Sequence, residues 1–349
     1  MNGEMNKCEK ENLIEKSKKA LRREFVSMEG EGWKQYNEYI KSSDMLEALS
    51  VLLNATREEE EIECSFSNEY IDMENPHRFF IHGEEEICIN YDNVLDITPT
   101  NSFSYWYQGE EVTDYFVSNM NVIGVDSYSG KFIYSGIINE ESAYAGFVDL
   151  SSAILTSRII IYTFDENSAA WKRYFAESYR LYKSGQYKLA FLHAFIGFES
   201  QIEYINGIIY DVYLDEQNQM LKFEFEECNK LCYPPITLLE EFVLGSESYK
   251  RMKHLKKENR SLIDDKLVTV LKYVNDLETK SANNKVKKFK FFEKLRNILA
   301  HGDSLERDDF KKGRLYNKYY CNKEKSFDFE TAYVDFFECI GILIKELIK

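Results

Sequence analysis

The pattern of apolar and polar positions changes twice along the chain. Residues 9–54 are polar, with apolar side chains at helical spacing, and we expect two helices separated near "EGEGW". From about residue 62 to 164, short aromatic and β-branched runs such as "RFFIH", "FSYWYQG" and "RIIIYTF" alternate with turn-forming segments. These runs indicate a mostly antiparallel sheet. After "DENSAAW", where Ser168 suits a helix N-cap, helical spacing returns.

The C-terminal part predicts an all-α bundle of about five or six helices. Its segments are "AAWKRYFAESYRLYK" ending near Gly185, the strongly apolar "YKLAFLHAFIGFESQIEYINGIIYDVYL", "PPITLLEEFVL", "LIDDKLVTVLKYVNDLE", "VKKFKFFEKLRNILAH" and "FETAYVDFFECIGILIKELI". The expected fold class is therefore α+β. We expect an N-terminal helical segment at 1–60, a β-rich sensor or regulatory domain at 61–166 and a helical domain at 167–349.

The charge of the chain is strongly uneven. The net charge of −16 argues against a general coat for nucleic acid or membrane surfaces, because phosphate-rich partners would be repelled at long range. The segment 250–296 nevertheless holds 15 Lys and Arg against 6 Asp and Glu. This segment is either a solvated lysine-rich helix face or a binding site for an anionic ligand.

The cysteines and the apolar runs bear on the cellular compartment. Seven cysteines, an odd number, and the lack of a leader pattern make a secreted disulfide framework a poor fit, so we expect a cytoplasmic protein with reduced thiols. No apolar run approaches the roughly 20 residues that a membrane span requires. We therefore expect no membrane partner.

The stretch "FFEKLRNILAHGDSL" places three polar residues at the end of an otherwise apolar helix. With about 100° per residue and Phe292 at 0°, its other large apolar residues fall within an arc of roughly 240° to 360°. We expect this arc to be the buried stripe. Arg296, Asn297 and His301 fall between roughly 40° and 180°, which predicts a polar cleft on the opposite side, with Gly302 ending the helix.

These residue types suit metal-free cleavage of RNA. An arginine grips a phosphate at two points without losing its charge, and an imidazole can take and return a proton near neutral pH. Asn297 would orient the imidazole or a ribose hydroxyl. The 2′-OH of RNA would attack the adjacent phosphorus, a reaction for which DNA has no group. The alternative is an ordinary helix end, whose Arg and His complement the helix dipole.

The motif "LRNILAHG", about 100 residues after the apolar helix "YKLAFLHAFIGFESQIEYI", resembles the HEPN superfamily (higher eukaryotes and prokaryotes nucleotide-binding domains). The signature is an arginine followed, after four to six residues, by a histidine, and Arg296, Asn297 and His301 match it. The resemblance covers residues 168–349. It implies a helical bundle that forms a homodimer with a composite active site, and a ribonuclease that needs no metal and no cofactor.

The resemblance also assigns roles to residues. Arg296 would stabilise the phosphate, His301 would handle the proton and Asn297 would orient, while Glu199 would support Arg296. Lysines on the motif helix are further candidates for binding substrate: Lys287, Lys288, Lys290 and Lys294. A toxin branch of the family carries a modified tyrosine two residues after the histidine, where this chain has Asp303, so that regulation is not expected.

The function implied is a toxin or a phage-defence (abortive infection) effector that cuts RNA, with tRNA as one candidate. Its N-terminal part would hold the enzyme inactive or sense a phage or antitoxin trigger protein. The alternative is a non-catalytic HEPN-like module that binds RNA or a nucleotide, or that only dimerises. In that reading the same arginine and histidine hold a ligand without cutting it.

Other candidate sites are weaker. Cys228 and Cys232 lack the further ligands of a zinc site, and "GVDSYSGKF" reads as a β-turn because its glycines are spaced wrongly for a phosphate loop. His77 and His82 lie near acidic residues but have no nucleophile context. His193 is expected to pack on its helix. Aromatic residues of one strand stack bases, bind a protein partner or pack the sheet: Tyr105, Trp106 and Tyr107.

Overall fold

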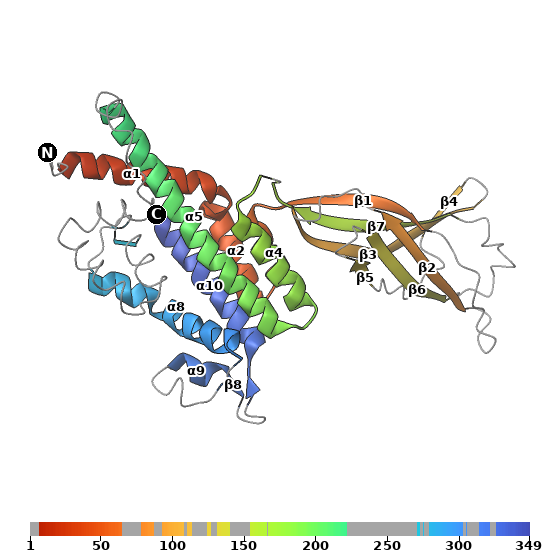
Figure 1. The fold of residues 1–349 in the computed structure, drawn as a ribbon. Helices are drawn as coiled ribbons and strands as arrows, with labels where there is room; N and C mark the ends of the chain where they lie inside the picture. The colour runs from red at the N-terminus through yellow and green to blue at the C-terminus, as the bar shows by residue number, and fades with distance from the viewer. Residues whose placement is uncertain are drawn as a thin grey trace. The chain divides into compact units, whose positions relative to one another are not determined.

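The computed structural model describes residues 7–64, 78–86, 93–107, 110–113, 124–126, 131–139, 154–165, 167–221, 271–272, 275, 279–302, 305, 314–321 and 326–349. The chain forms two compact units (Figure 1). One unit is helical and is built from Met1–Asn54 and Ala169–Lys349, and the other is the β unit, Ala55–Ser168. The α+β class is confirmed. The division differs from the expected three parts, because the N-terminal helices join the C-terminal bundle and the β unit is inserted between them.

The N-terminal segment holds three α-helices and a short 3-10 helix where two helices were expected. They are α1 (Lys7–Glu24), the 3-10 helix Val26–Met28, α2 (Gly30–Ser42) and α3 (Met45–Leu53). The glycines of "EGEGW" lie inside the first turn of α2 and do not form a separate linker. A Cβ at Gly32 would overlap the Ser27 carbonyl oxygen, so glycine is required where α2 follows the 3-10 helix.

The N-terminal helices pack against the C-terminal half of the sequence. The Tyr36 hydroxyl on α2 donates to the Phe337 carbonyl at 2.6 Å, and a Cβ at Gly341 would overlap the Tyr36 ring. On α1, Arg22 Nε donates to the Ile348 carbonyl at 2.7 Å. Apolar side chains of α1 and α2 are almost fully buried, including Leu21 and Tyr36 at 0% and 1% exposure. These contacts make the first helices part of one hydrophobic core with the last one.

The β unit holds two sheets in which every described pairing is antiparallel, as expected. Its strands are β1 (Thr56–Cys64), β2 (Arg78–Glu86), β3 (Val94–Tyr107), β4 (Glu110–Thr113), β5 (Gly124–Asp126), β6 (Lys131–Asn139) and β7 (Ile154–Thr163). The first sheet has the order β1-β7-β3-β4 and the second has the order β2-β6-β5. Register shifts in β3 flank Pro99, in line with the preference of proline for irregular positions in a sheet.

The helical unit holds five further helices among its described residues. They are α4 (Ala170–Lys183), α5 (Tyr187–Leu221), α8 (Thr279–Ala300), α9 (Arg314–Tyr319) and α10 (Phe329–Leu347). A two-stranded ladder, β8 (Tyr320–Cys321) with β9 (Ser326–Phe327), precedes α10 and was not expected in the helical domain. Ser168 does not cap α4: the N-cap is Ala169, with no side-chain hydrogen bond. The segment "PPITLLEEFVL" lies outside the described residues.

The centre of the bundle is aromatic. Helices α5, α8 and α10 contact one another, with α5 and α10 side by side in Figure 1. Phe198 of α5 stacks on Phe289 of α8 with ring centroids 4.6 Å apart, and Phe292 of α8 meets Phe336 of α10 at 5.1 Å. All four side chains are at most 3% exposed. The motif helix α8 is therefore held on a rigid, well-packed support.

Candidate active site

The buried face of α8 is turned relative to the expected one. The almost fully buried residues of α8 are Ala282, Val286, Phe289, Phe292 and Leu295. With Phe292 at 0°, their mean direction lies at about 40°, which is the direction of Arg296 itself. The prediction that Arg296 lies opposite the buried stripe is therefore wrong. Phe291, Ile298 and Leu299, three residues of the predicted stripe, are only half-buried.

Arg296 points from this packed face toward α5. Its Nη2 forms an ion pair with Glu199 Oε1 of α5, the contact expected from the family resemblance. Its Nη1 donates to Asn297 Oδ1 at 2.8 Å, and its Cζ lies 5.1 Å from the centroid of the Phe195 ring. The side chains of Arg296 and Glu199 remain 27% and 35% exposed. The guanidinium thus lies at the rim of the core, with a fixed direction and partial access to solvent.

One nitrogen of Arg296 has no partner. Arg296 Nε is buried and makes no hydrogen bond in the structure. A buried donor without an acceptor is unfavourable by about 1–3 kcal/mol, and native proteins rarely keep one without a reason. The guanidinium therefore keeps hydrogen-bonding capacity that neither Glu199 nor Asn297 uses.

His301 lies at the end of the same helix and faces solvent. Its backbone N–H donates to the Asn297 carbonyl at 3.1 Å, so His301 belongs to the last helical turn, and Gly302 follows with a φ of +71°. The predicted glycine stop is confirmed, since this left-handed conformation favours glycine. About 140° around the helix axis separates His301 from Arg296. The structure places Asn297, a solvent-exposed residue, against Arg296 and not against the imidazole.

The candidate substrate lysines divide into two groups. Lys287, Lys290 and Lys294 are exposed and follow one another at helical spacing on the side of α8 that carries Asn297 and His301. Lys288 lies about 100° away from Lys287. It lines a cavity of about 190 Å³ between α8 and α10, together with Cys339.

That cavity and a second one are remote from the motif. The second cavity, of about 480 Å³, lies between the α4–α5 turn and the start of α10, where Tyr187 and Phe329 line it. Neither is lined by Arg296 or His301. In the first cavity, burial raises the pKa of the Cys339 thiol to about 12, which makes it a poor nucleophile at neutral pH.

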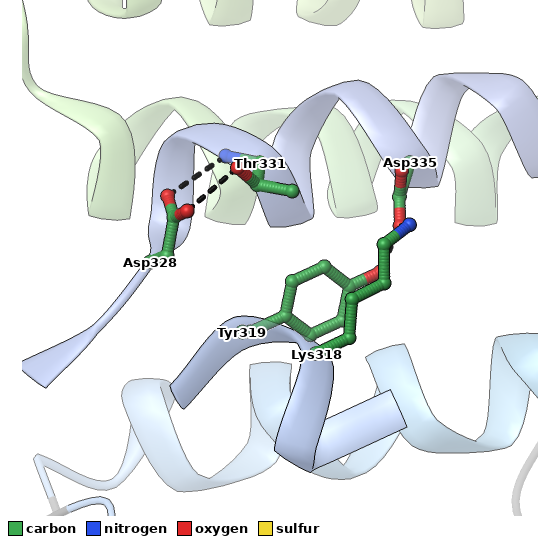
Figure 2. Close-up of polar contacts among 5 residues, drawn as sticks. All are labelled: Lys318, Tyr319, Asp328, Thr331 and Asp335. Atoms are coloured by element: carbon green, nitrogen blue, oxygen red, sulfur yellow. Dashed lines mark hydrogen bonds and ion pairs between the residues drawn. The ribbon is translucent and has the colours of Figure 1, made fainter. Parts of the chain in front are cut away.

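A second polar cluster, which the sequence analysis did not single out, joins α9 to α10. Figure 2 shows Lys318 and Tyr319 of α9 pointing toward Asp335 of α10. The Tyr319 hydroxyl donates to Asp335 Oδ2 at 2.6 Å, and Lys318 forms an ion pair with the same oxygen. Burial, reinforced by the bond to Asp335, raises the pKa of Tyr319 above its ordinary value. We call these three residues the α9–α10 cluster.

Phe195 is the residue at the motif that sequence reasoning missed. It lies four residues before Glu199, so both side chains project from neighbouring positions of α5 toward Arg296. Spacing from the predicted acidic partner was the signal that could have identified it. His193, on the same helix, is half-buried as expected, and burial lowers the pKa of its imidazole.

Several weaker candidates cannot be placed in the same way. Cys228, Cys232, His77 and Asp303 lie outside the described residues, while His82 lies on β2 and the aromatic run Tyr105–Tyr107 ends β3. Within the described part of the chain, no group of three or more His, Cys, Asp or Glu side chains could hold a metal ion. In the same part, no helix combines the length and the apolar character needed to cross a membrane.

Comparisons with known proteins assign no further role to these residues. No family model, no curated protein and no solved structure matches this chain.

Proposed function

We propose that this chain is a metal-independent endoribonuclease of the HEPN type, acting in the cytoplasm. The observation that supports the proposal best is the arrangement at the end of α8. Arg296 is held in place by Glu199 over the Phe195 ring, and an exposed His301 follows on the last turn. The four side chains come from two helices of one rigid core, which favours a preorganised site.

The reaction proposed is transfer of a phosphodiester within RNA. An imidazole takes the proton of a 2′-OH, the 2′ oxygen bonds to the adjacent phosphorus, and the bond from phosphorus to the 5′ oxygen breaks. The departing 5′ oxygen receives a proton from an imidazolium. Arg296 stabilises the charge that develops on the non-bridging phosphate oxygens. The products are a 2′,3′-cyclic phosphate and a 5′-OH.

The geometry favours a homodimer with a composite site. Arg296 and His301 leave α8 in directions about 140° apart, so one protomer offers the guanidinium and the imidazole from different sides of the helix. A second copy facing the first would bring one imidazole toward the guanidinium of the other. Leu189 and Ile196 of α5 are 47% and 40% exposed, and Ile196 lies three residues before Glu199. Exposed apolar side chains beside the motif suit such an interface.

The biological role proposed is that of a toxin or phage-defence effector, with tRNA as one candidate substrate and the β unit as the regulatory part. This role rests on the family resemblance. A phage or antitoxin protein would act as trigger or inhibitor.

One observation favours a second function, a non-catalytic RNA-binding or dimerisation module. The two Nη groups of Arg296 are already bonded within the protomer, as they would be in a purely structural ion pair. In that case the arginine would fix α8 to α5, and the exposed histidine would bind a ligand without moving a proton.

Cleavage products separate the two functions. The full-length protein is incubated with total cellular RNA and with a synthetic RNA in the presence of EDTA, and the 3′ ends are analysed. We expect fragments with 2′,3′-cyclic phosphates from the wild-type protein and no fragments from Arg296→Ala or His301→Ala. The matched control is Arg173→Ala, which removes an exposed arginine from α4 and should cut as the wild type does. Cutting that persists in both motif variants, or that EDTA abolishes, would overturn the proposal.

A further inference from the structure

Exposed polar side chains form one line along α8. The line consists of Lys280, Lys287, Lys290, Lys294, Asn297 and His301, all of them exposed. From Lys287 onward the spacing is three, four, three and four residues, and Lys280 precedes Lys287 by seven. Such a repeat keeps side chains on one side of a helix. We call this line the α8 stripe.

The stripe is a local reversal of the charge of the chain. Helix α8 carries seven Lys and Arg and a single acidic residue, Glu293, which is half-buried, in a chain with a net charge of −16. Two lysines of α8 lie off the stripe: Lys285 forms an ion pair with Glu346 of α10, and Lys288 lines the cavity beside Cys339. Four of the six lysines of α8 therefore lie in one exposed row that ends at His301.

We infer that the α8 stripe is a track for the backbone of single-stranded RNA leading to His301. This inference rests on the proposed function and names the form of its substrate. From Lys287 to His301 the helix rises about 21 Å, which is the length of about six phosphates in a stacked strand. Lysines bind phosphates as point charges, and contacts to phosphates carry no sequence information. The track would therefore position RNA of any sequence beside the imidazole.

Two physical arguments favour a single strand over other anionic partners. A helix that lies on a lipid surface inserts an apolar face, whereas the apolar face of α8 is buried in the bundle and the stripe holds only polar residues. A straight row of cations matches one backbone, while duplex RNA is bound through contacts spread over two strands and successive grooves. Single strands also leave the 2′-OH free to align with the phosphorus.

Binding as a function of salt tests the track without requiring cleavage. All proteins carry His301→Ala so that the RNA stays intact, and the full chain is titrated with a fluorescent 20-nucleotide RNA between 50 and 200 mM salt. The track variant adds Lys287→Gln, Lys290→Gln and Lys294→Gln. The matched control removes the same charge from α1 and α2 with Lys18→Gln, Lys19→Gln and Lys41→Gln. Thermal melting confirms that each variant is folded.

We expect the track variant to bind more weakly and to depend less on salt. Each lost phosphate contact on a single strand lowers the slope of log K against log salt by about 0.7, so three contacts lower it by about 2. Across the fourfold salt range, affinity of the protein with an intact stripe should then fall roughly 20-fold more than that of the track variant. The control should keep the slope of the intact protein.

Three results would overturn the track: an unchanged slope in the track variant, tighter lysine-dependent binding of the same RNA as a duplex, or lysine-dependent binding to phosphatidylserine vesicles without binding to RNA. A failure of the proposed nuclease activity can be distinguished from a failure of the track. If the wild-type protein cuts no RNA while the slope still changes, the track stands and the nuclease does not. If the wild-type protein cuts RNA and the slope does not change, the nuclease stands and the track does not.

Discussion

The helical unit holds two polar sites that differ in how completely their groups are satisfied. In the α9–α10 cluster, Asp335 accepts a hydrogen bond from the Tyr319 hydroxyl and forms an ion pair with Lys318 (Figure 2). The Asp335 side chain is only 18% exposed. At the motif, Arg296 keeps a buried N–H without a partner, and His301 faces solvent. A carboxylate oxygen that both Lys318 and Tyr319 of α9 contact fastens two helices together. At the motif, a partly exposed guanidinium and an exposed imidazole both keep access to an anion from solvent, and this difference separates a structural site from a candidate active site.

The largest expected effect is on cleavage by the motif. His301→Ala should lower the rate of RNA cleavage by about 1,000-fold, since a general acid–base group contributes roughly 10²–10⁴. Because His301 is exposed, the melting temperature should move by less than about 2 °C. Initial rates and thermal denaturation followed by circular dichroism measure both. A rate within tenfold of the wild type would remove the histidine from the reaction.

The second effect is on stability, at the α9–α10 cluster. Asp335→Ala leaves the Tyr319 hydroxyl without its acceptor and should lower the free energy of unfolding by about 1–3 kcal/mol. Cleavage by the folded protein at 25 °C should stay within twofold. Tyr319→Phe is the control, because it removes the hydroxyl and leaves Asp335 with Lys318, and it should cost about 1 kcal/mol. If Asp335→Ala abolished cleavage in a stable protein, the comparison between the two sites would fail.

A smaller effect is expected from the residue that holds the arginine. Glu199→Gln keeps an acceptor for Arg296 but loses the charge-assisted bond, so the cleavage rate at saturating RNA should fall about tenfold, or ~1.4 kcal/mol in barrier height. The affinity for RNA should stay within twofold, since Glu199 acts through Arg296. Single-turnover rates and equilibrium binding distinguish the two. Weaker binding at an unchanged rate would mean that Glu199 does not position the guanidinium.

The smallest effect concerns alkaline pH. The pKa of Tyr319 is raised in the folded protein, by burial first and then by its bond to Asp335. The unfolded chain releases this proton near pH 10, so the contribution is complete below pH 10 and is lost as pH rises toward the folded-state pKa. Above pH 10, Tyr319→Phe should therefore lose stability less steeply, by about 1.4 kcal/mol per pH unit. Urea unfolding at pH 8, 9, 10 and 11 measures these slopes. If the free energy of unfolding changed with pH in parallel in the wild type and in Tyr319→Phe, the Tyr319 phenol would not be buried in the cluster.

The sequence predicted local structure where local rules decide it. Apolar periodicity located α4, α5, α8 and α10, and the β-branched runs located the antiparallel strands. The glycine after His301 marked the end of α8, because the left-handed conformation that commonly ends a helix favours glycine. The Glu199–Arg296 contact was also expected, from the family resemblance. Nothing local indicated the α9–α10 cluster, whose partners are 16 and 17 residues apart and lie on either side of the β8–β9 ladder.

What the sequence by itself determined is the angular order of residues around each helix and the class of each segment. Only the tertiary structure decided which direction of α8 faces the core. Arg296 could join the packed side because Phe195 and Glu199 of α5 offer it a ring face and a carboxylate. Likewise, only tertiary contacts placed Tyr36 against Gly341, 305 positions later in the chain, and so made the first helices part of the bundle. Helix geometry fixes the angles between side chains, but the partners that bury one direction come from distant parts of the sequence.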